Sequence, residues 1–362
     1  MTETILVLFV FICFVQVAYH WFFFSKILGY QDAKSENHKS VSVVIAARNE
    51  ADRLESLIKV LAEQNHPNYE VIVINDRSTD NTLELLETLR TRFNWLKVIN
   101  LNETELGWTG KKNALRKGVA SAKNDILLFT DADCLPKSED WINEMTSGKA
   151  DVCIGFSPYL IKNGFLNQFI QFETLITGLQ YLSFALLKRP YMAVGRNWSI
   201  KRTCYPHEFL ESIKHFEGGD DDLIVNHLSD KLTFEVRLGQ KSQTYSVPKT
   251  QWRHYLHQKK RHISVGKYYN KKHLTLLGVF TLSHVIGWLM FLLALMTAFK
   301  PLTILTIFGL RSLSFYTIFT RVGHKLGTSP KIWALPLLDL CYSLYYPFVG
   351  IGAWSIKNIK WS

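Results

Sequence analysis

The sequence predicts an α/β domain built on a mostly parallel, doubly wound sheet, with membrane-spanning helices before and after it in the chain. Three observations among the 362 residues lead to this fold class. A run of 20 uncharged residues lies near the start, further apolar stretches close the chain, and strand-like and helix-like patterns alternate between them. The hydrophobic fraction of 47% excludes a disordered chain.

The first apolar run, residues 5–24, predicts a membrane anchor over residues 1–25. A helix of this length is enough to cross a hydrocarbon core of ~30 Å. The run ends in aromatic residues without a small-x-small exit, so we expect a permanent anchor and not a cleaved signal peptide. Three lysines follow it, Lys26, Lys34 and Lys39. By the positive-inside rule they place the next domain, residues 26–250, in the cytoplasm.

The C-terminal part of the chain, residues 274–362, predicts further membrane helices in three apolar stretches, 274–299, 302–320 and 332–356. At a rise of ~1.5 Å per residue, Arg311 and Asp339 lie about 15 and 12 Å from the basic residues that flank one face. Charges at such depth are usually paired, so we predict an ion pair between them. Four simple spans would put Lys357 and Lys360 outside, and a tilted or re-entrant last segment therefore stays open.

The net charge of +11 is concentrated toward the C-terminus. Residues 267–362 hold ten Lys and Arg and one acidic residue, whereas residues 26–266 hold 32 basic and 29 acidic residues. A nucleic-acid binder carries its positive charge on the folded domain, so we expect no nucleic-acid partner and infer a bilayer surface. The five cysteines show no paired spacing, which argues against a disulfide or zinc framework.

The middle of the chain alternates strand and helix patterns. Four apolar runs rich in β-branched residues predict buried strands at 41–45, 71–74, 96–99 and 126–129. Helical patterns lie between them: one opens at 49–52 and presents four leucines and isoleucines on one face, one is capped by Asp80, and one covers 114–122. Such alternation predicts right-handed crossovers and parallel pairing. No glycine-rich dinucleotide or P-loop motif is present.

Acidic residues follow two of the predicted strands, at the sheet edge where ligands of such folds bind. Asp131 and Asp133 form a D-x-D motif whose carboxylates suit Mg²⁺ or Mn²⁺. An ordinary acidic turn is the alternative. Asp76 follows the second strand, where its carboxylate would accept from a base N–H or a ribose hydroxyl, or else cap a turn or helix.

Four later segments are further candidates for a role in the site. Lys111 lies at a predicted helix start, where backbone N–H groups and a lysine both meet phosphate. The acids 220–222 follow two glycines, so they are solvated, bound to a cation or poised to accept a proton. The basic, aromatic segment 251–273 is also typical of an interfacial helix. An apolar helix at 165–187 lies at the interface or in a core.

Taken in order, these motifs resemble membrane-bound family 2 glycosyltransferases, the group that includes ceramide glucosyltransferase and the cellulose and hyaluronan synthases. The resemblance covers roughly residues 41–267 and the flanking membrane helices, and it implies a Rossmann-like sheet of the GT-A fold. It also implies Mg²⁺ or Mn²⁺ held by Asp131 and Asp133. Nucleotide contacts are implied for the residues Ala47, Arg48, Glu50, Asp76, Lys111 and Asp131.

The resemblance also assigns catalytic residues. Aligning Leu223 with the leucine of the family's E-D-x-[DE] motif makes Asp220 the general base, and Asp221 stays a candidate because Gly219 replaces the usual preceding acid. The family's Q-x-x-R-W appears as Gln258-Lys-Lys-Arg-His262, which implies catalytic roles for Gln258 and Arg261. On the acceptor side we expect three residues, Gly195, Asn197 and His262.

The implied activity is inverting transfer from a nucleoside diphosphate sugar, with a UDP-sugar as the expected donor, to a lipid-linked or glycan acceptor. The expected setting is a bacterial inner (plasma) membrane with a cytoplasmic catalytic domain. Two alternatives stay open at this point. One is a processive polysaccharide synthase of the same fold, and the other is a nucleotide-sugar-binding membrane protein without turnover.

Overall fold

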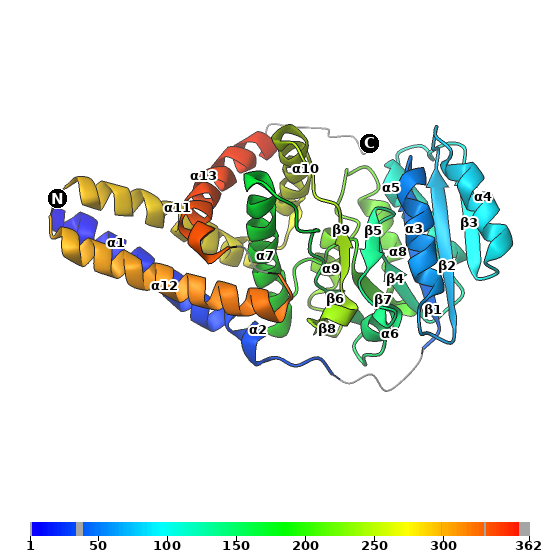
Figure 1. Cartoon of the computed structure of the whole chain (residues 1–362), viewed down its shortest axis with the longest axis horizontal. Coiled ribbons are helices and arrows are strands. Elements are labelled where there is room, and N and C mark those ends of the chain that lie inside the picture. The colour runs from blue at the N-terminus through cyan, green and yellow to red at the C-terminus, as the bar shows by residue number, and fades with distance from the viewer. Residues whose placement is uncertain (1, 34–38, 298, 329–330, 355–362) are drawn as a thin grey trace. The chain divides into compact units, whose positions relative to one another are not determined.

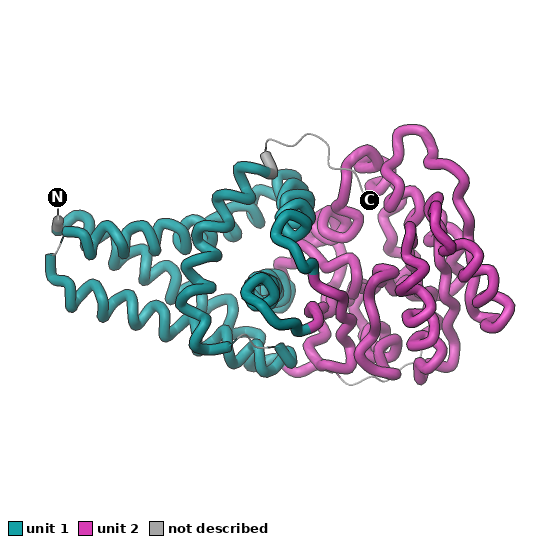
Figure 2. The backbone as a smooth tube through the Cα atoms, turned by 45° about the horizontal axis from the view of Figure 1, so that its top comes forward, with its two compact units in different colours: residues 1–30, 161–187, 249–356 teal, residues 31–160, 188–248, 357–362 magenta. Residues whose placement is uncertain are grey.

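The computed structural model describes residues 2–33, 39–297, 299–328 and 331–354, and the chain divides into two compact units (Figure 2). The membrane unit consists of Met1–Tyr30, Ile161–Leu187 and Lys249–Ile356. The sheet unit consists of Gln31–Leu160 and Lys188–Pro248. Lys34, Lys357 and Lys360, which entered the predictions above, lie outside the described residues.

The sheet unit is built on seven strands in the order β3-β2-β1-β4-β7-β6-β8 (Figure 1). They are β1 (Val41–Ala47), β2 (Tyr69–Asp76), β3 (Leu96–Leu101), β4 (Ile126–Phe129), β6 (Val152–Gly155), β7 (Trp198–Lys201) and β8 (Phe234–Arg237). Strand β7 runs antiparallel to β4 and β6, and the other pairings are parallel. The prediction of a mostly parallel sheet is confirmed, and this architecture is typical of the GT-A fold.

Helices cover both faces of the sheet because side chains alternate along each strand. Helix α3 (Ala51–Ala62) buries its predicted apolar face in the same cluster as Val43 and Ile45. Helix α5 (Gly110–Ser121) packs on the opposite face, where a Cβ at Gly118 would lie 2.5 Å from Ile74 and 2.7 Å from Val44. Gly118 therefore allows the close approach of α5 to the sheet. Two shorter helices, α4 (Thr82–Arg92) and α6 (Trp141–Thr146), contribute buried residues to the same cluster as α3.

The strand order reverses at β1, which pairs with β2 on one side and β4 on the other. The connections after β1 and β4 therefore diverge. The carboxyl ends of these two strands form the usual ligand edge of a doubly wound sheet. A two-stranded sheet follows β4, in which β5 (Cys134–Pro136) pairs antiparallel with β9 (Thr244–Ser246).

The membrane unit contains four helices long and apolar enough to cross a membrane, by length and composition, within the described residues. These candidate spans are Glu3–Gly29, Lys271–Met296, Pro301–Lys325 and Ile332–Gly352. The first comprises α1 (Thr2–Tyr19), a π-helical turn (His20–Phe24) and α2 (Lys26–Gly29); the others contain α11 (Lys271–Met296), α12 (Pro301–Lys325) and α13 (Leu335–Trp354). Figure 1 shows α1, α11 and α12 running side by side.

Two more helices belong to the membrane unit, α7 (Phe165–Leu186) and α10 (Trp252–Val265). The ring of Phe172 on α7 contacts Phe319 on α12 at 4.8 Å and Tyr342 on α13 at 6.0 Å between centroids. Of the two readings of the segment 165–187, the structure therefore favours a core helix.

The predicted ion pair between Arg311 and Asp339 is confirmed, with 2.5 Å between Arg311 Nη1 and Asp339 Oδ2. Two further helices contribute to it: Gln16 accepts from Arg311 Nε, and His284 Nε2 lies 3.1 Å from Asp339 Oδ1. All four side chains are at most 1% exposed. This polar cluster links α1, α11, α12 and α13, and the sequence reasoning missed Gln16 and His284.

Candidate functional site

Three predicted site residues gather at the ligand edge of the sheet, in a group we call the acid cluster: Lys111, Asp131 and Asp220. Asp131 follows β4, and Asp220 lies just before α9 (Asp222–Leu228). Lys111 joins them from the first turn of α5, with its Nζ 3.0 Å from Asp131 Oδ1 and 3.2 Å from Asp220 Oδ2. The topology thus brings together side chains that are separated by up to 109 positions in the sequence.

Charges within the acid cluster shift its pKa values. Burial raises the pKa of Asp220, but the charges of Lys111 and Lys112 outweigh this and leave the pKa lowered. Burial, and then the negative charge of Asp220, raise the pKa of Asp221 to about 6. Burial lowers the pKa of Lys111, but Asp131 and Asp220 outweigh it and the pKa is raised. When Asp220 and Asp221 together carry one proton, that proton therefore resides on Asp221, and Asp220 stays ionised.

Asp221 lies beside the acid cluster but has structural partners. Its Oδ1 accepts a hydrogen bond from the backbone N–H of Asp222 at 2.8 Å and so caps α9. Its Oδ2 is 2.8 Å from the position that a Cβ on Gly195 would occupy. Any larger residue at Gly195 would therefore press against Asp221, and the backbone at this position approaches the acid cluster closely.

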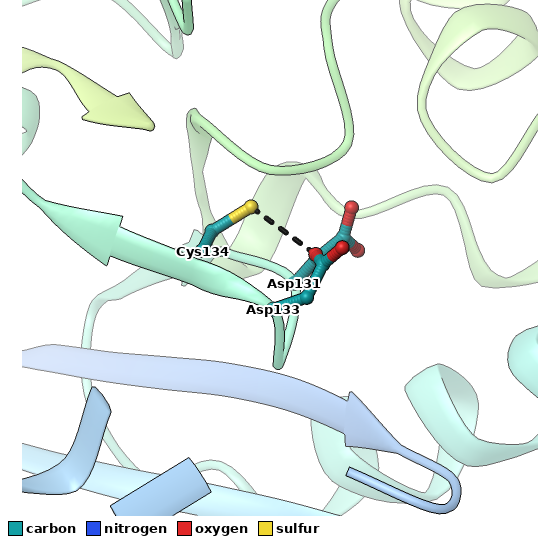
Figure 3. A group of neighbouring side chains, drawn as sticks. All are labelled: Asp131, Asp133 and Cys134. Atoms are coloured by element: carbon teal, nitrogen blue, oxygen red, sulfur yellow. Dashed lines mark hydrogen bonds between the residues drawn. The ribbon is translucent and has the colours of Figure 1, made fainter. Parts of the chain in front are cut away.

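Asp131 and Asp133 form the candidate metal site, and Figure 3 shows them together with Cys134. One potential ligand atom from each of the three lies within 4.8 Å of the others. Two carboxylates fit a hard cation such as Mg²⁺ or Mn²⁺. Burial and the charges of Asp133 and Asp131 raise the pKa of the Cys134 thiol, which donates to Asp133 Oδ1 at 3.4 Å. The oxygen atoms fit the cation, and the protonated thiol orients Asp133.

The loops after β1 and β2 form the expected nucleotide side. Asp76 is fully buried and accepts two hydrogen bonds from Arg77, at 2.7 and 3.0 Å. Asn49 ties the two loops together, since its N–H donates to Ser78 Oγ at 2.9 Å. Glu50 accepts from Arg53 at 3.3 Å, and the same arginine lies 3.7 Å from Asp133 Oδ2. Of the other two predicted residues, Ala47 is buried at the end of β1 and Arg48 is half-buried after it.

Comparison with known proteins identifies this domain. Residues 42–206 match the family model "Glycosyl transferase family 2". This region belongs to glycosyltransferase family 2. The matched residues include the opening strand, Lys111 and the D-x-D motif, and they end before the acids 220–222.

Two similar proteins place the family 2 domain in context. A 4,4'-diaponeurosporenoate glycosyltransferase of Staphylococcus aureus is 32% identical over 145 residues, which span 39% of this chain and 37% of that protein. The structure of the mannosyltransferase PcManGT from Pyrobaculum calidifontis, in complex with GDP-Man and Mn²⁺, superposes with a TM-score of 0.58 at 17% identity. It covers 99% of this chain and 100% of that one, which supports the same fold.

The remaining predicted residues lie on α10 (Trp252–Val265) and directly before β7. Gln258, Arg261 and His262 lie on α10, which belongs to the membrane unit, and the first two are half-buried whereas His262 is exposed. Asn197 in the family 2 domain is fully buried. Its amide accepts from Trp141 Nε1 at 2.9 Å and donates to two backbone carbonyls, at 2.8 and 2.9 Å. These partners give Asn197 a structural role and leave it no exposed surface for an acceptor, contrary to our expectation.

Lys112 supports the acid cluster of the family 2 domain and was not singled out from the sequence. Its Nζ is fully buried and donates to the carbonyls of Ile213 at 3.0 Å and Phe216 at 2.5 Å. These carbonyls belong to the segment that leads into Gly218 and Asp220. Burial lowers the pKa of Lys112 to about 8. The sequence signal that could have revealed Lys112 is the pair of adjacent lysines at the start of one helix.

This lowered pKa predicts a pH-dependent stability. Between about pH 8 and the usual Lys value of 10.5, the unfolded chain binds more protons than the folded one, so stability rises with pH. Over the whole window the gain is up to about 3 kcal/mol. Lys112→Arg, which stays protonated, should lack this rise. Thermal melting of both proteins at the two ends of the window checks it, and parallel pH dependences would contradict it.

Proposed function

We propose that this protein is a membrane-bound, inverting glycosyltransferase that moves a sugar from a nucleoside diphosphate sugar, with a UDP-sugar as the first candidate, to a lipid-linked or glycan acceptor. The observation that carries the proposal is the acid cluster, in which Lys111 contacts both Asp131 and Asp220 at the ligand edge of a family 2 domain. The lysines that flank the first span support a cytoplasmic domain at a bacterial inner membrane.

In the proposed reaction, the acceptor hydroxyl oxygen forms a bond to the anomeric carbon while the bond from that carbon to the diphosphate breaks. Asp220 takes the hydroxyl proton as general base, since it stays ionised and lies in the acid cluster. Lys111 moves from its carboxylate partners to the leaving diphosphate, and Arg261 and Gln258 assist. Mg²⁺ or Mn²⁺ held by Asp131 and Asp133 would supply further positive charge for the diphosphate oxygens.

The nature of the acceptor follows from the membrane unit. Four candidate spans in the same chain favour an acceptor that resides in the bilayer. The similarity to a 4,4'-diaponeurosporenoate glycosyltransferase supports a lipid-like acceptor. The polar cluster favours single transfer over processive export, because Arg311 is engaged by Asp339, Gln16 and His284 and does not serve to line a pore.

A panel of donors tests the proposal. The purified full-length protein, with Mn²⁺, is incubated with UDP- and GDP-sugars, including GDP-mannose because of the ligand of the similar fold. Sugar release and thermal shift are the readouts, and one donor should give both. Loss of the activity on adding EDTA is expected, and full activity in EDTA would remove the metal from the proposal. Turnover of none of these donors would favour the binding protein without catalysis.

Asp133→Ala is expected to weaken Mn²⁺-dependent nucleotide binding by roughly tenfold or more, since it removes one of two carboxylate ligands. Calorimetry with UDP or GDP, with and without Mn²⁺, measures the effect. Glu139→Ala is a matched control, because it removes an exposed carboxylate of the same domain that makes no contact with the acid cluster. Equal loss in both variants would contradict a role for Asp133 in holding the metal.

A further inference from the structure

Arg196 has a positive charge near the acid cluster that the proposed mechanism does not use. It follows Gly195, whose backbone lies against Asp221. Its charge acts on Cys134 and Asp131: burial lowers the pKa of Arg196, but Tyr159, Cys134 and Asp131 outweigh it and the pKa is raised. Arg196 is therefore within electrostatic range of the candidate metal site.

The guanidinium of Arg196 is held in place by neutral groups. Its Nε donates to Ser157 Oγ at 2.8 Å and its Nη2 donates to the Ser157 carbonyl at 2.7 Å. The ring of Tyr159 covers one face, with 4.4 Å between the ring centroid and Arg196 Cζ. No carboxylate within the described ranges forms an ion pair with Arg196, although the side chain is only half-buried. A fixed and unneutralised charge is thus present beside the site.

The support for Arg196 is itself rigid. Ser157 is 1% exposed, and its hydroxyl donates to the carbonyl of Thr244 at 2.7 Å. Thr244 is fully buried and donates from its own hydroxyl to the Arg196 carbonyl at 3.0 Å. Thr244 begins β9, which pairs with β5 directly after Asp133. The arginine and the D-x-D motif are therefore attached to the same small sheet, which fixes their separation.

We propose that Arg196 binds an anionic oxygen of a reactant, carried either by the diphosphate of the donor or by an acidic group on the acceptor. A guanidinium fixed through two of its five N–H groups is pre-organised for a planar carboxylate or phosphate. The inference rests on the proposed function and adds a binding residue to its site. A purely structural arginine would satisfy the same contacts to Ser157 and Tyr159 without affecting any ligand.

Arg196→Met tests the proposal in the full-length protein, with UDP plus Mn²⁺ and inorganic pyrophosphate as donor-side probes, and octanoate compared with octanol as acceptor-side probes. Arg202→Met is the matched control, since it removes the same charge from an exposed arginine just after β7 that donates to the Asn124 carbonyl at 2.9 Å. Ser157→Ala is a second variant that keeps the charge and removes one anchor. Thermal melting shows whether each variant is folded.

A loss of about tenfold or more in pyrophosphate and UDP affinity in Arg196→Met, absent from Arg202→Met, would assign the anion to the donor. Unchanged UDP affinity with lost preference for octanoate over octanol would assign it to the acceptor. Ser157→Ala should give a smaller loss for the same probe. If folded Arg196→Met and Ser157→Ala bind all probes as Arg202→Met does, the proposal is wrong. A wild-type protein that does not bind UDP with Mn²⁺ would instead overturn the proposed function.

Discussion

Asp220→Asn is expected to lower sugar transfer by about 10²- to 10⁴-fold, the usual contribution of a general base. The amide is nearly isosteric with the carboxylate but does not accept the hydroxyl proton. Nucleotide binding should persist, because Asp131 and Asp133 are intact in this variant. Single-turnover transfer and nucleotide calorimetry on the same preparation separate the two effects.

Asp221→Asn is the control for this assignment, because it changes the neighbouring carboxylate. Its Oδ1 caps α9 and its Oδ2 lies against Gly195, so an amide oxygen keeps the cap and transfer should fall much less. Full transfer by Asp220→Asn together with an inactive Asp221→Asn would move the general base by one residue.

Arg311→Met is expected to destabilise the detergent-extracted protein by about 3 kcal/mol or more, because the buried Asp339 carboxylate loses the guanidinium that balances its charge. Both side chains are at most 1% exposed, so solvent offers little compensation. The double variant Arg311→Met/Asp339→Leu should recover much of the loss, since it removes both charges. Thermal or denaturant unfolding measured for the single and double variants gives the coupling energy.

Arg321→Met is a suitable comparison, since it removes an exposed arginine from the last turns of the same helix, α12. Its effect should stay within about 0.5 kcal/mol, as for most surface substitutions. If Arg311→Met and Arg321→Met melt alike, the polar cluster does not hold the four helices together.

The parts of the fold that were predictable from the sequence are those with long and regular patterns. Strands β1 to β4 and helix α3 lie where apolar periodicity placed them. Strands β6, β7 and β8, of four residues each, were not predicted. β8 also ends in Arg237, which is fully buried because it donates to the carbonyl of Glu144 at 2.7 Å, and a buried arginine is a tertiary effect that local pattern does not reveal.

Asp131 was predictable because it follows β4 at the ligand edge of a doubly wound sheet. Asp220 was assigned through the family resemblance, and its contact with Lys111 of α5 depends on the fold. The contacts of Lys112 and Arg196 depend on loops whose course only the fold determines. Gln16 and His284 had a usable signal, since polar residues inside apolar membrane segments generally face a partner.

Helix α7 has a practical consequence, because it belongs to the membrane unit yet lies in the sequence between two neighbouring strands of the sheet, β6 and β7. During synthesis, β7 emerges directly after α7, whereas the aromatic neighbours of α7 on α12 and α13 emerge only after the last strand of the sheet. Trimming both termini to obtain a water-soluble catalytic fragment would leave 22 mostly apolar residues stranded within it. Biochemistry on this protein therefore calls for nanodiscs or micelles from the outset.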